Sequence, residues 1–521
     1  MKTKTFLFVL INLIIIEISY CQKFYNVLDF GAKNDGVRKN TMAIYKAISE
    51  ASKNGGGTVY FPAGVYLTGP IHLKSNITLF IEAGAILKFS DDFDDYLPMV
   101  QSRYEGNDII NFSPLIYAYE AENIAIIGRG TLDGQGKKWW DFFLNLYRNP
   151  PDSLNKWQKE FKRLNNDIIW PEDRKILELG FCRPPFIQPM YCKNILIEGI
   201  KIINSPFWTV NPEFCENVTV NAVTIINPPS PNTDGINPES CKNVHISNCH
   251  ISVGDDCITI KSGRDEAGRK KGMAAENYTI TNCTMLSGHG GVVIGSEMSG
   301  GVKKIAISNC IFDGTDRGIR IKSSRGRGGV VEDIRVSNII VKNLKYEAVT
   351  LNLLYSKSMP EEVSEKTPLF KNIHISNISG TAKQACSIFG LEEMPVNDIS
   401  FSDINLETQK GFTLNYSTNI TLNNIILNVD KGPAISIDNS KQIEINGIRN
   451  LTPSTESPIA ELINTQNVLI HNCFQMTETD LFLKVDGEFS RDIFVENNNF
   501  NFVKTIYYKS DIVPDNAVKI K

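Results

Sequence analysis

The sequence predicts an all-β fold: a single-stranded, right-handed parallel β-helix with an N-terminal capping helix and long loop insertions. Three observations predict it. A short repeat runs through most of the chain, each copy alternates apolar and polar residues, and most copies begin with Asn or a similar residue. Alternation with β-branched residues favours strands over helices, and recurrence at a short period favours a stacked solenoid.

A short spacing separates the clearest copies of the repeat. They begin at Asn194, Asn217 and Asn243, so that successive copies are 23 and 26 residues apart. Coils of that length would stack their strands at the usual spacing of about 4.8 Å. Because Asn tolerates left-handed backbone and can hydrogen-bond to an Asn on the next coil, we expect these residues to form a scaffold ladder.

The N-terminus predicts a signal peptide over residues 1–21. Two lysines precede an apolar run over residues 6–16, which is too short for a membrane span, and Ser19 and Cys21 are small enough to flank a cleavage site. Lipidation of Cys21 is the alternative. Either way, the mature protein is expected to be secreted, periplasmic or held at the cell surface.

Eleven cysteines in an exported chain would ordinarily suggest disulfides. Their placement predicts something else, because Cys192, Cys215 and Cys241 each stand two positions before the first Asn of a repeat. Cysteines at one phase of a repeat stack in a column, and a free Cys packs as a small apolar side chain. We therefore expect mostly unpaired thiols in the core.

Residues 22–521 are predicted to form one β-helical domain whose N-terminal end is closed by a helix. Asn40 precedes this helix as its expected N-cap. The apolar residues that follow at helical spacing are Ile44, Ala47, Ile48 and Ala51. Residues 90–175 form an insertion that is rich in aromatic side chains. These aromatics could line a binding site or pack the insertion against the solenoid, and the sequence leaves both possibilities open.

The overall charge excludes some classes of partner. The chain has a formal net charge of −4 and a pI near 6.0, so that no basic field favours nucleic acid. The sequence contains no stretch that suits a membrane span and no cofactor motif. We therefore expect a monomer without nucleic-acid or cofactor partners, in which a polyanionic ligand would bind through a local group of Lys and Arg.

Four polar motifs interrupt four consecutive coils. The interval from Asp234 to Asp256 is 22 residues, one coil without an insertion, and the intervals of 33 residues to His289 and 31 to Arg320 are one coil plus a loop each. All four motifs are therefore expected on one face of the β-helix. In chain order, the motifs are Asn232-Thr233-Asp234-Gly235, Gly254-Asp255-Asp256, Gly288-His289-Gly290 and Arg320-Ile321-Lys322.

The three carboxylates predict acid–base chemistry without a metal. Adjacent Asp255 and Asp256 reach one cleft only where the chain bends, which Gly254 permits. Repulsion between these two groups and Asp234 should raise one pKa, as a general acid requires. Neighbouring coils should hold the carboxylates about 6.5–9.5 Å apart, which leaves room for a water molecule and predicts an inverting hydrolysis.

The ordered set of motifs resembles the polygalacturonase family of glycoside hydrolases, family 28. The opening Asp29-Phe-Gly-Ala-Lys-Asn-Asp-Gly is also similar to the N-terminal signature of pectin-degrading β-helices. The resemblance implies a secreted enzyme that cleaves α-1,4-galacturonosyl linkages of pectin by single displacement. Residues 22–521 would then be the catalytic domain, and the partner a pectic polysaccharide or an oligogalacturonide.

The resemblance also implies a role for each motif residue. Asp255 would protonate the glycosidic oxygen, and Asp234 and Asp256 would hold and activate the attacking water. His289 would hydrogen-bond within the cluster and help to set its protonation. A pair of cations would grip the galacturonate carboxylate, and an amide would support the site. The residues implied for substrate binding are Asn232, Arg320 and Lys322.

One family feature is missing where we expect it. Family members often carry an active-site Tyr on a later coil, but the corresponding segment contains Phe389 and no Tyr. Either Tyr355 or a loop aromatic takes its place, or the contact with the +1 sugar differs.

Several activities remain open at the level of the sequence. The insertion at 90–175 and the loops at 264–276 and 324–329 could close one end of a groove, which favours exo action on chain ends or oligogalacturonides. Endo action and hydrolysis of rhamnogalacturonan or xylogalacturonan are alternatives within the hydrolases. A calcium-dependent pectate lyase and a non-catalytic glycan-binding β-helix are alternatives from other classes.

Overall fold

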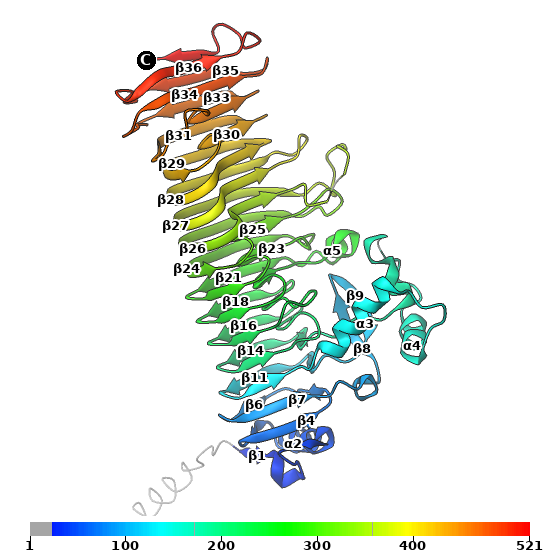
Figure 1. Cartoon of the computed structure of the whole chain (residues 1–521). Helices are drawn as coiled ribbons and strands as arrows, with labels where there is room; N and C mark the ends of the chain where they lie inside the picture. The colour runs from blue at the N-terminus through cyan, green and yellow to red at the C-terminus, as the bar shows by residue number, and fades with distance from the viewer. Residues whose placement is uncertain (1–22, 171, 357) are drawn as a thin grey trace, which may run out of the picture.

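The structure, a computed structural model, describes residues 23–170, 172–356 and 358–521. These residues form one long right-handed parallel β-helix, whose coils stack in chain order from one end of the molecule to the other (Figure 1). The predicted fold class is therefore confirmed. The expected signal peptide and Cys21 lie outside the described residues. No helix in the described ranges combines the length and apolar character that crossing a membrane requires.

Each coil contributes to three faces, within which successive strands pair in parallel. The first face follows the Asn of each repeat and is continuous from end to end. Its strands are β1 (Phe24–Asn26), β3 (Gly57–Phe61), β6 (Ile77–Ile81), β11 (Glu122–Gly128), β14 (Lys193–Glu198), β16 (Glu216–Asn221), β18 (Lys242–Ser247), β21 (Ala275–Thr281), β24 (Val302–Asp313), β26 (Val330–Asn352), β27 (Leu369–Phe389), β28 (Val396–Asn415), β29 (Ser417–Val429), β31 (Lys441–Asn450), β33 (Gln466–His471), β35 (Arg491–Glu496) and β37 (Val518–Ile520).

The second face follows directly and merges with the first in the long strands from β24 onwards. Its separate strands are β2 (Asp35–Lys39), β4 (Gly64–Thr68), β7 (Ala85–Phe89), β12 (Thr131–Asp133), β15 (Lys201–Ile203), β17 (Thr224–Ile226), β19 (His250–Ser252) and β22 (Thr284–Ser287).

The third face begins after the turn that carries the first three polar motifs, and the fourth motif lies on the face itself. Single bridges continue it through 210–213 and 236–239, and the ends of β26, β27 and β28 extend it towards the C-terminus. Its separate strands are β5 (Ile71–His72), β10 (Ile116–Tyr119), β13 (Ile187–Met190), β20 (Ile258–Ile260), β23 (Val292–Ile294), β25 (Ile319–Lys322), β30 (Ile435–Asp438), β32 (Ala460–Ile463), β34 (Thr479–Asp486) and β36 (Val503–Lys509).

The predicted ladder of Asn side chains runs along one turn of the β-helix. The amide of Asn217 donates to Asn194 at 2.9 Å, that of Asn243 to Asn217 at 3.0 Å, and that of Asn277 to Asn243 at 3.1 Å. All four residues have left-handed backbone, with φ between 56° and 63°. Asn is suited to this position because it tolerates left-handed backbone and supplies both a donor and an acceptor.

Replacement of Asn243 tests how much this ladder stabilises the fold. We expect Asn243→Ala to lower the free energy of unfolding by about 1–2 kcal/mol, because Ala is strained in left-handed backbone and the two ladder hydrogen bonds are lost. Asn243→Gly should lose less, since Gly keeps the conformation at no steric cost. Urea unfolding of both variants measures the difference, and equal losses would contradict a conformational role for Asn.

The cysteines form the expected core thiols. All ten cysteines in the described residues are free and buried. The backbone N–H of Cys192 donates to the sulfur of Cys215 at 3.4 Å, and that of Cys215 donates to the sulfur of Cys241 at 3.4 Å. Burial raises the pKa of Cys215 well above its usual value. Cys215 therefore stays protonated and packs as an apolar side chain.

The capping helix is present, but Asn40 does not cap it. Helix α2 (Thr41–Lys53) buries the four apolar residues expected of it and covers the first coils together with the short helix η1 (Val27–Phe30). The Asn40 side chain instead accepts a hydrogen bond from the N–H of Lys33 at 2.6 Å and donates to two carbonyls of its own loop. Asn40 thus closes the preceding loop, since its side chain is already engaged there.

The segment at 90–175 is two excursions rather than one insertion, because β10, β11 and β12 make a regular coil between them. The first excursion holds the short helix η2 (Phe93–Tyr96) and the antiparallel hairpin of β8 (Val100–Tyr104) and β9 (Asn107–Asn111). The second holds α3 (Lys137–Arg148), α4 (Lys156–Leu164) and η3 (Glu172–Leu179). Both lie on the same side of the β-helix (Figure 1).

The aromatic side chains mainly hold the two excursions together. Trp139 of α3 is fully buried and packs against Phe93 with ring centroids 4.3 Å apart and against Phe112 at 5.4 Å. Trp157 of α4 contacts the same Phe93 at 5.3 Å. Of the two possibilities that the sequence left open, packing therefore holds for these residues.

Candidate active site

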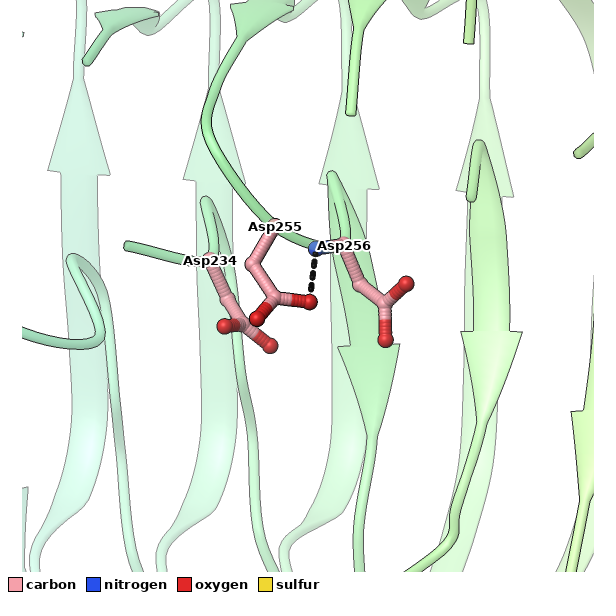
Figure 2. A group of neighbouring side chains, drawn as sticks. All are labelled: Asp234, Asp255 and Asp256. Atoms are coloured by element: carbon pink, nitrogen blue, oxygen red, sulfur yellow. Dashed lines mark hydrogen bonds between the residues drawn. The ribbon is translucent and has the colours of Figure 1, made fainter. Parts of the chain in front are cut away.

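The structure brings three carboxylates together where the third face begins. Asp234 lies two residues before Ile236, and Asp255 and Asp256 precede Ile258 on the adjacent rung, with the N–H of Gly235 bonded to the carbonyl of Asp256 at 3.0 Å. One oxygen atom of each carboxylate lies within 4.8 Å of the others. Figure 2 shows the side chains projecting from the turn to the same side.

A bend in the backbone makes this convergence possible. Gly254 is packed so closely that a Cβ atom there would lie 2.5 Å from backbone atoms of Ser230. Beyond it, the N–H of Asp256 donates to Asp255 Oδ1 at 2.9 Å, which fixes the Asp255 side chain against the backbone of the same turn. Adjacent residues, which would face opposite ways on a regular strand, thereby serve one site.

The expected carboxylate separation is wrong. Closest oxygens within 4.8 Å are much nearer than the roughly 6.5–9.5 Å on which the inference of inversion depended. The carboxylates approach so closely because adjacent rungs lie only about 4.8 Å apart and the bend removes the lateral offset. The stereochemistry therefore has to be argued from accessibility and charge instead.

Asp256 is a buried anion held by two cations of β25. Lys322 Nζ lies 2.8 Å from Asp256 Oδ2, and Arg320 Nη1 lies 3.5 Å from Oδ1. Burial alone would raise the pKa of Asp256, but the attraction of Lys322 and Arg320 outweighs it and keeps the pKa below the usual value. Asp256 therefore stays ionised at neutral pH.

Asp234 has the opposite electrostatic environment. Its Oδ2 accepts from Asn237 Nδ2 at 2.9 Å and from Thr259 Oγ1 at 3.3 Å, whereas its buried Oδ1 has no hydrogen-bond partner among the described residues. Burial, and then repulsion by Asp255, raises the pKa of Asp234 well above the usual value. The expected raised pKa is thus present, and it falls on Asp234, the carboxylate assigned to the water. Because the carboxylates are this close, the proton belongs to the cluster rather than to one residue.

Asp255 is the carboxylate that a bulky ligand can reach. Its side chain is 20% exposed, compared with 2% for Asp256. Nδ1 of His289, which is itself half-exposed, lies 3.0 Å from Asp255 Oδ1, and this hydrogen bond raises the pKa of the imidazole. With one Asp255 oxygen bound by His289 and by backbone, the other is left to contact a ligand.

Tyr355, one of the aromatic residues considered in place of the missing Tyr, lies beside the cations of the site. Its half-exposed ring lies over both cations of β25, with the centroid 5.6 Å from the guanidinium of Arg320 and 5.3 Å from the ammonium of Lys322. Phe389 lies two rungs beyond Lys322 in the same register. The sequence named Tyr355 as a candidate, and its position beside the cations follows from the loop after Asn352.

Asn232 contacts a different part of the site from the one expected. Its Oδ1 accepts from Arg183 Nη2 at 2.9 Å, and its backbone is left-handed with φ of 53°. The buried Arg183 guanidinium also lies 3.9 Å from the ring centroid of Phe143 in α3. Asn232 therefore links the turn before Asp234 to the second excursion, and its hydrogen bond is not to a carboxylate of the cluster.

The β8–β9 hairpin is anchored beside the carboxylates, on the rung of Asp234 and on the rung before it. Tyr104 stacks on Phe207 with centroids 4.6 Å apart. The buried guanidinium of Arg103 pairs with Glu213 at 3.2 Å and also with Glu239, which lie at equivalent positions on successive rungs of the third face. The hairpin is therefore anchored by buried ion pairs across the face on which the carboxylates lie.

The loops after the third face join this wall. Glu105 at the hairpin tip pairs with Arg264 at 3.3 Å, and Arg327 pairs with Asp265 at 2.7 Å, at the start of α5 (Asp265–Lys271). Arg269 donates to the carbonyl of Gly326 at 2.6 Å. The loops at 264–276 and 324–329 thus bind each other and the hairpin.

Four polar residues around the cluster escaped the sequence analysis. They are Asn237, Thr259, Lys261 and Glu297, and all lie on the third face or in the loop after it. Thr259 and Lys261 continue the strand that follows Asp256. A Lys at the end of a short apolar strand was therefore the sequence feature that could have pointed to Lys261 as a site residue. Glu297 lies in a different loop, and its approach to Lys261 depends on how the rungs stack.

The fold and this site together define a β-helical glycoside hydrolase with its acids in a turn beside a pair of cations. A family model described as glycosyl hydrolases family 28 matches residues 169–426, and one described as rhamnogalacturonase A/epimerase, pectate lyase-like, matches residues 24–142. A probable polygalacturonase from Vitis vinifera is 33% identical over 394 residues, which are 73% of this chain and 74% of that protein. The chain belongs to glycoside hydrolase family 28.

Solved structures show the same similarity. A hyperthermoactive exopolygalacturonase from Thermotoga maritima is 37% identical with a TM-score of 0.70, covering 78% of this chain and 92% of that one. A family 28 exopolygalacturonase from Yersinia enterocolitica is 25% identical with a TM-score of 0.62, covering 86% of this chain and 78% of that one.

Proposed function

We propose that this protein hydrolyses the α-1,4-galacturonosyl linkages of homogalacturonan and its oligosaccharides, and removes galacturonate from chain ends. The observation that carries the proposal is one accessible carboxylate, Asp255, within 4.8 Å of two buried carboxylates and beside the Arg320–Lys322 pair. Acids placed next to cations suit a substrate whose sugar units are themselves anionic. Family membership and the polygalacturonase names of the relatives support the same activity.

Asp255 is the proposed general acid. It is the only one of the three carboxylates exposed enough to contact the glycosidic oxygen, and the cluster retains a proton because its members repel one another. Protonation of the leaving oxygen by such a group is the acid step of glycoside hydrolysis. His289 would hold one Asp255 oxygen and leave the other free to deliver the proton.

Asp234 and Asp256 are the proposed residues that hold the attacking water. Both are almost fully buried, so a water molecule can reach them and a sugar carbon cannot. Asp234 Oδ1 is a buried acceptor without a partner among the described residues, which such a water would satisfy. Attack by a held water in a single displacement inverts the anomeric carbon, so inversion follows from accessibility.

Arg320 and Lys322 are the proposed binding residues for the galacturonate carboxylate. Each already contacts Asp256, so an incoming carboxylate would share cations with the catalytic cluster. Binding of substrate would then draw positive charge away from Asp256 as the ring settles against Tyr355, which covers both cations. Asn232 would support this site through Arg183 and the second excursion.

Exo action follows from the wall built by the hairpin. Arg103 anchors it to Glu239 on the rung of Asp234 and to Glu213 on the rung before, and Glu105 joins its tip to the loop at Arg264. A polymer lying along the third face would have to end there. The exopolygalacturonases among the similar structures support the same conclusion.

Product analysis tests both parts of the proposal. With oligogalacturonides that carry a fluorescent tag at the reducing end, we expect free galacturonate as the first product and tagged chains that shorten by one unit at a time. Untagged oligomers longer than one unit at early times would contradict exo action while leaving hydrolysis intact. A first product only from rhamnogalacturonan or xylogalacturonan would move the substrate assignment to those polymers.

The same assay separates hydrolysis from elimination. Lys322 and Arg320 already supply Asp256 with the positive charge that calcium would bring to a lyase. Activity should therefore survive excess chelator without unsaturated products that absorb near 235 nm. Chelator-sensitive formation of such products would favour a lyase, and binding without any cleavage would favour a glycan-binding protein.

Export of the protein belongs to the same proposal. A polymeric pectic substrate lies outside the cell, and the N-terminal sequence predicts a signal peptide. We expect the mature protein in the medium, the periplasm or at the cell surface, which fractionation of the producing cells would measure.

A further inference from the structure

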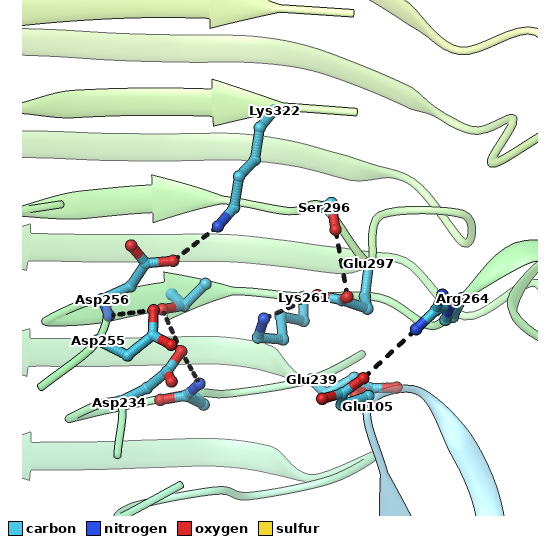
Figure 3. A network of polar contacts seen from close by, with 12 residues as sticks. Glu105, Asp234, Glu239, Asp255, Asp256, Lys261, Arg264, Ser296, Glu297 and Lys322 are labelled. Atoms are coloured by element: carbon cyan, nitrogen blue, oxygen red, sulfur yellow. Dashed lines mark hydrogen bonds and ion pairs between the residues drawn. The ribbon is translucent and has the colours of Figure 1, made fainter. Parts of the chain in front are cut away.

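Lys261 is a buried cation near Asp234 that has no role in the hydrolysis proposed above. Lys261 follows β20 on the third face, and its side chain is only 5% exposed. Its Nζ lies 2.8 Å from Glu297 Oε2 and 4.6 Å from the ring centroid of Trp208. Figure 3 shows the ammonium group of Lys261 lying between the carboxylate cluster and Glu297.

We propose that Lys261, held by Glu297, is a positioning residue that directs the proton of the carboxylate cluster away from Asp234 and on to Asp255. The inference rests on the proposed function, because only a hydrolase requires one carboxylate to be ionised and another protonated. It adds to that function a residue that touches neither the substrate nor the water.

The charges around the cluster show why Lys261 matters to Asp234 in particular. Asp256 has two cations within 3.5 Å, but Asp234 has no ion pair in the described part of the chain. Burial raises the pKa of Asp234, and the nearby positive charge of Lys261 lowers it. Without that cation, Asp234 would hold the proton more tightly and could not activate water.

Glu297 keeps Lys261 charged and in place. Burial alone would lower the pKa of Lys261, but Glu297 and then Asp234 outweigh it and raise the pKa, so the ammonium group persists. The cation–π contact with Trp208 also favours the charged form. Arg327 and Lys322 act on Glu297 in turn and help to keep its pKa well below the usual value.

Other charges face this pair from every neighbouring element, and a test must leave them unchanged. Glu239 is the neighbour of Lys261 on the preceding rung, but its carboxylate forms an ion pair with Arg103 of the hairpin. The charged groups that face Asp234, Lys261 or Glu297 are Asp255, Asp256, Glu239, Lys322 and Arg327.

The pH dependence of kcat/KM on a galacturonate trisaccharide tests the proposal. Lys261→Met removes the charge at similar volume, so Asp234 should ionise only at higher pH. We expect the acidic limb of the profile to move up by about one to three pH units, with KM near that of the wild type. An acidic limb that coincides with that of the wild type would overturn the proposal.

Two matched variants separate charge from folding. Lys261→Met/Glu297→Gln leaves no unpaired buried carboxylate, so its melting temperature should return towards the wild type while its acidic limb stays shifted. Glu297→Gln removes the carboxylate that keeps Lys261 charged, so its acidic limb should move in the same direction as that of Lys261→Met. A double variant with the wild-type profile would overturn the proposal, because the defect would then be structural. An inactive wild type would instead reject the proposed function.

Discussion

Replacement of Asp255 by Asn is expected to lower kcat on oligogalacturonides by about 10²–10⁴-fold, with little change in KM. Asn has the same shape and can still contact His289, but it cannot deliver a proton to the glycosidic oxygen. The loss should shrink on an aryl galacturonide, because a good leaving group departs without protonation. Initial rates on the two substrates measure the difference.

A matched substitution on the same face controls for nonspecific effects. Asp438 lies at the end of β30, in the register that includes Lys322 and four rungs further along the third face. Asp438→Asn should leave kcat unchanged. Equal losses for Asp255→Asn on the natural and the aryl substrates would argue that Asp255 is not the acid.

Replacement of Lys322 by Met is expected to damage both stability and activity. The change removes the 2.8 Å ion pair with Asp256 and leaves a buried carboxylate with only Arg320 at 3.5 Å. Breaking one side of a buried pair costs about 3–5 kcal/mol of unfolding free energy. Loss of a charged group that binds the substrate should also lower kcat/KM by about 10²–10³-fold.

Two further variants separate the loss of stability from the loss of activity in Lys322→Met. Lys322→Met/Asp256→Asn removes both charges, so stability should recover while activity does not. Lys484→Met removes an ion pair with Glu461 at the surface of the same face and should cost less than about 1 kcal/mol. Recovery of activity in the double variant would contradict the roles of both Lys322 and Asp256.

The sequence predicted the fold well because one physical pattern repeats in it. Asn194, Asn217 and Asn243 mark the same turn on successive coils, and the alternation after each of them decides which side chains enter the core. The excursions were predicted less well. The coil at 116–133 was placed inside one long insertion, although a copy of the repeat begins near Asn123, because the long segments on either side of it interrupt the pattern.

The residues of the site were predicted from their spacing in the sequence, but the distances between the carboxylates and the shifts of their pKa values were not. Counting residues per coil placed Asp234, Asp255 and Asp256 together, because the period fixes which residues share a face. The distances between the carboxylates depended on the bend at Gly254, and the shift of each pKa depended on burial. Lys261 and Glu297 meet only through stacking of loops that follow different strands, which no local pattern encodes.

Under the proposed exo action, the anchored hairpin closes one end of the substrate groove. In that case, a sugar cut from the end of a chain would lie between the hairpin and the remaining polymer. The monosaccharide then has no exit along the axis and must leave sideways, or after the polymer has withdrawn. Product release, rather than bond cleavage, would then be the rate-limiting step. Free galacturonate would compete with new chain ends for the same binding site.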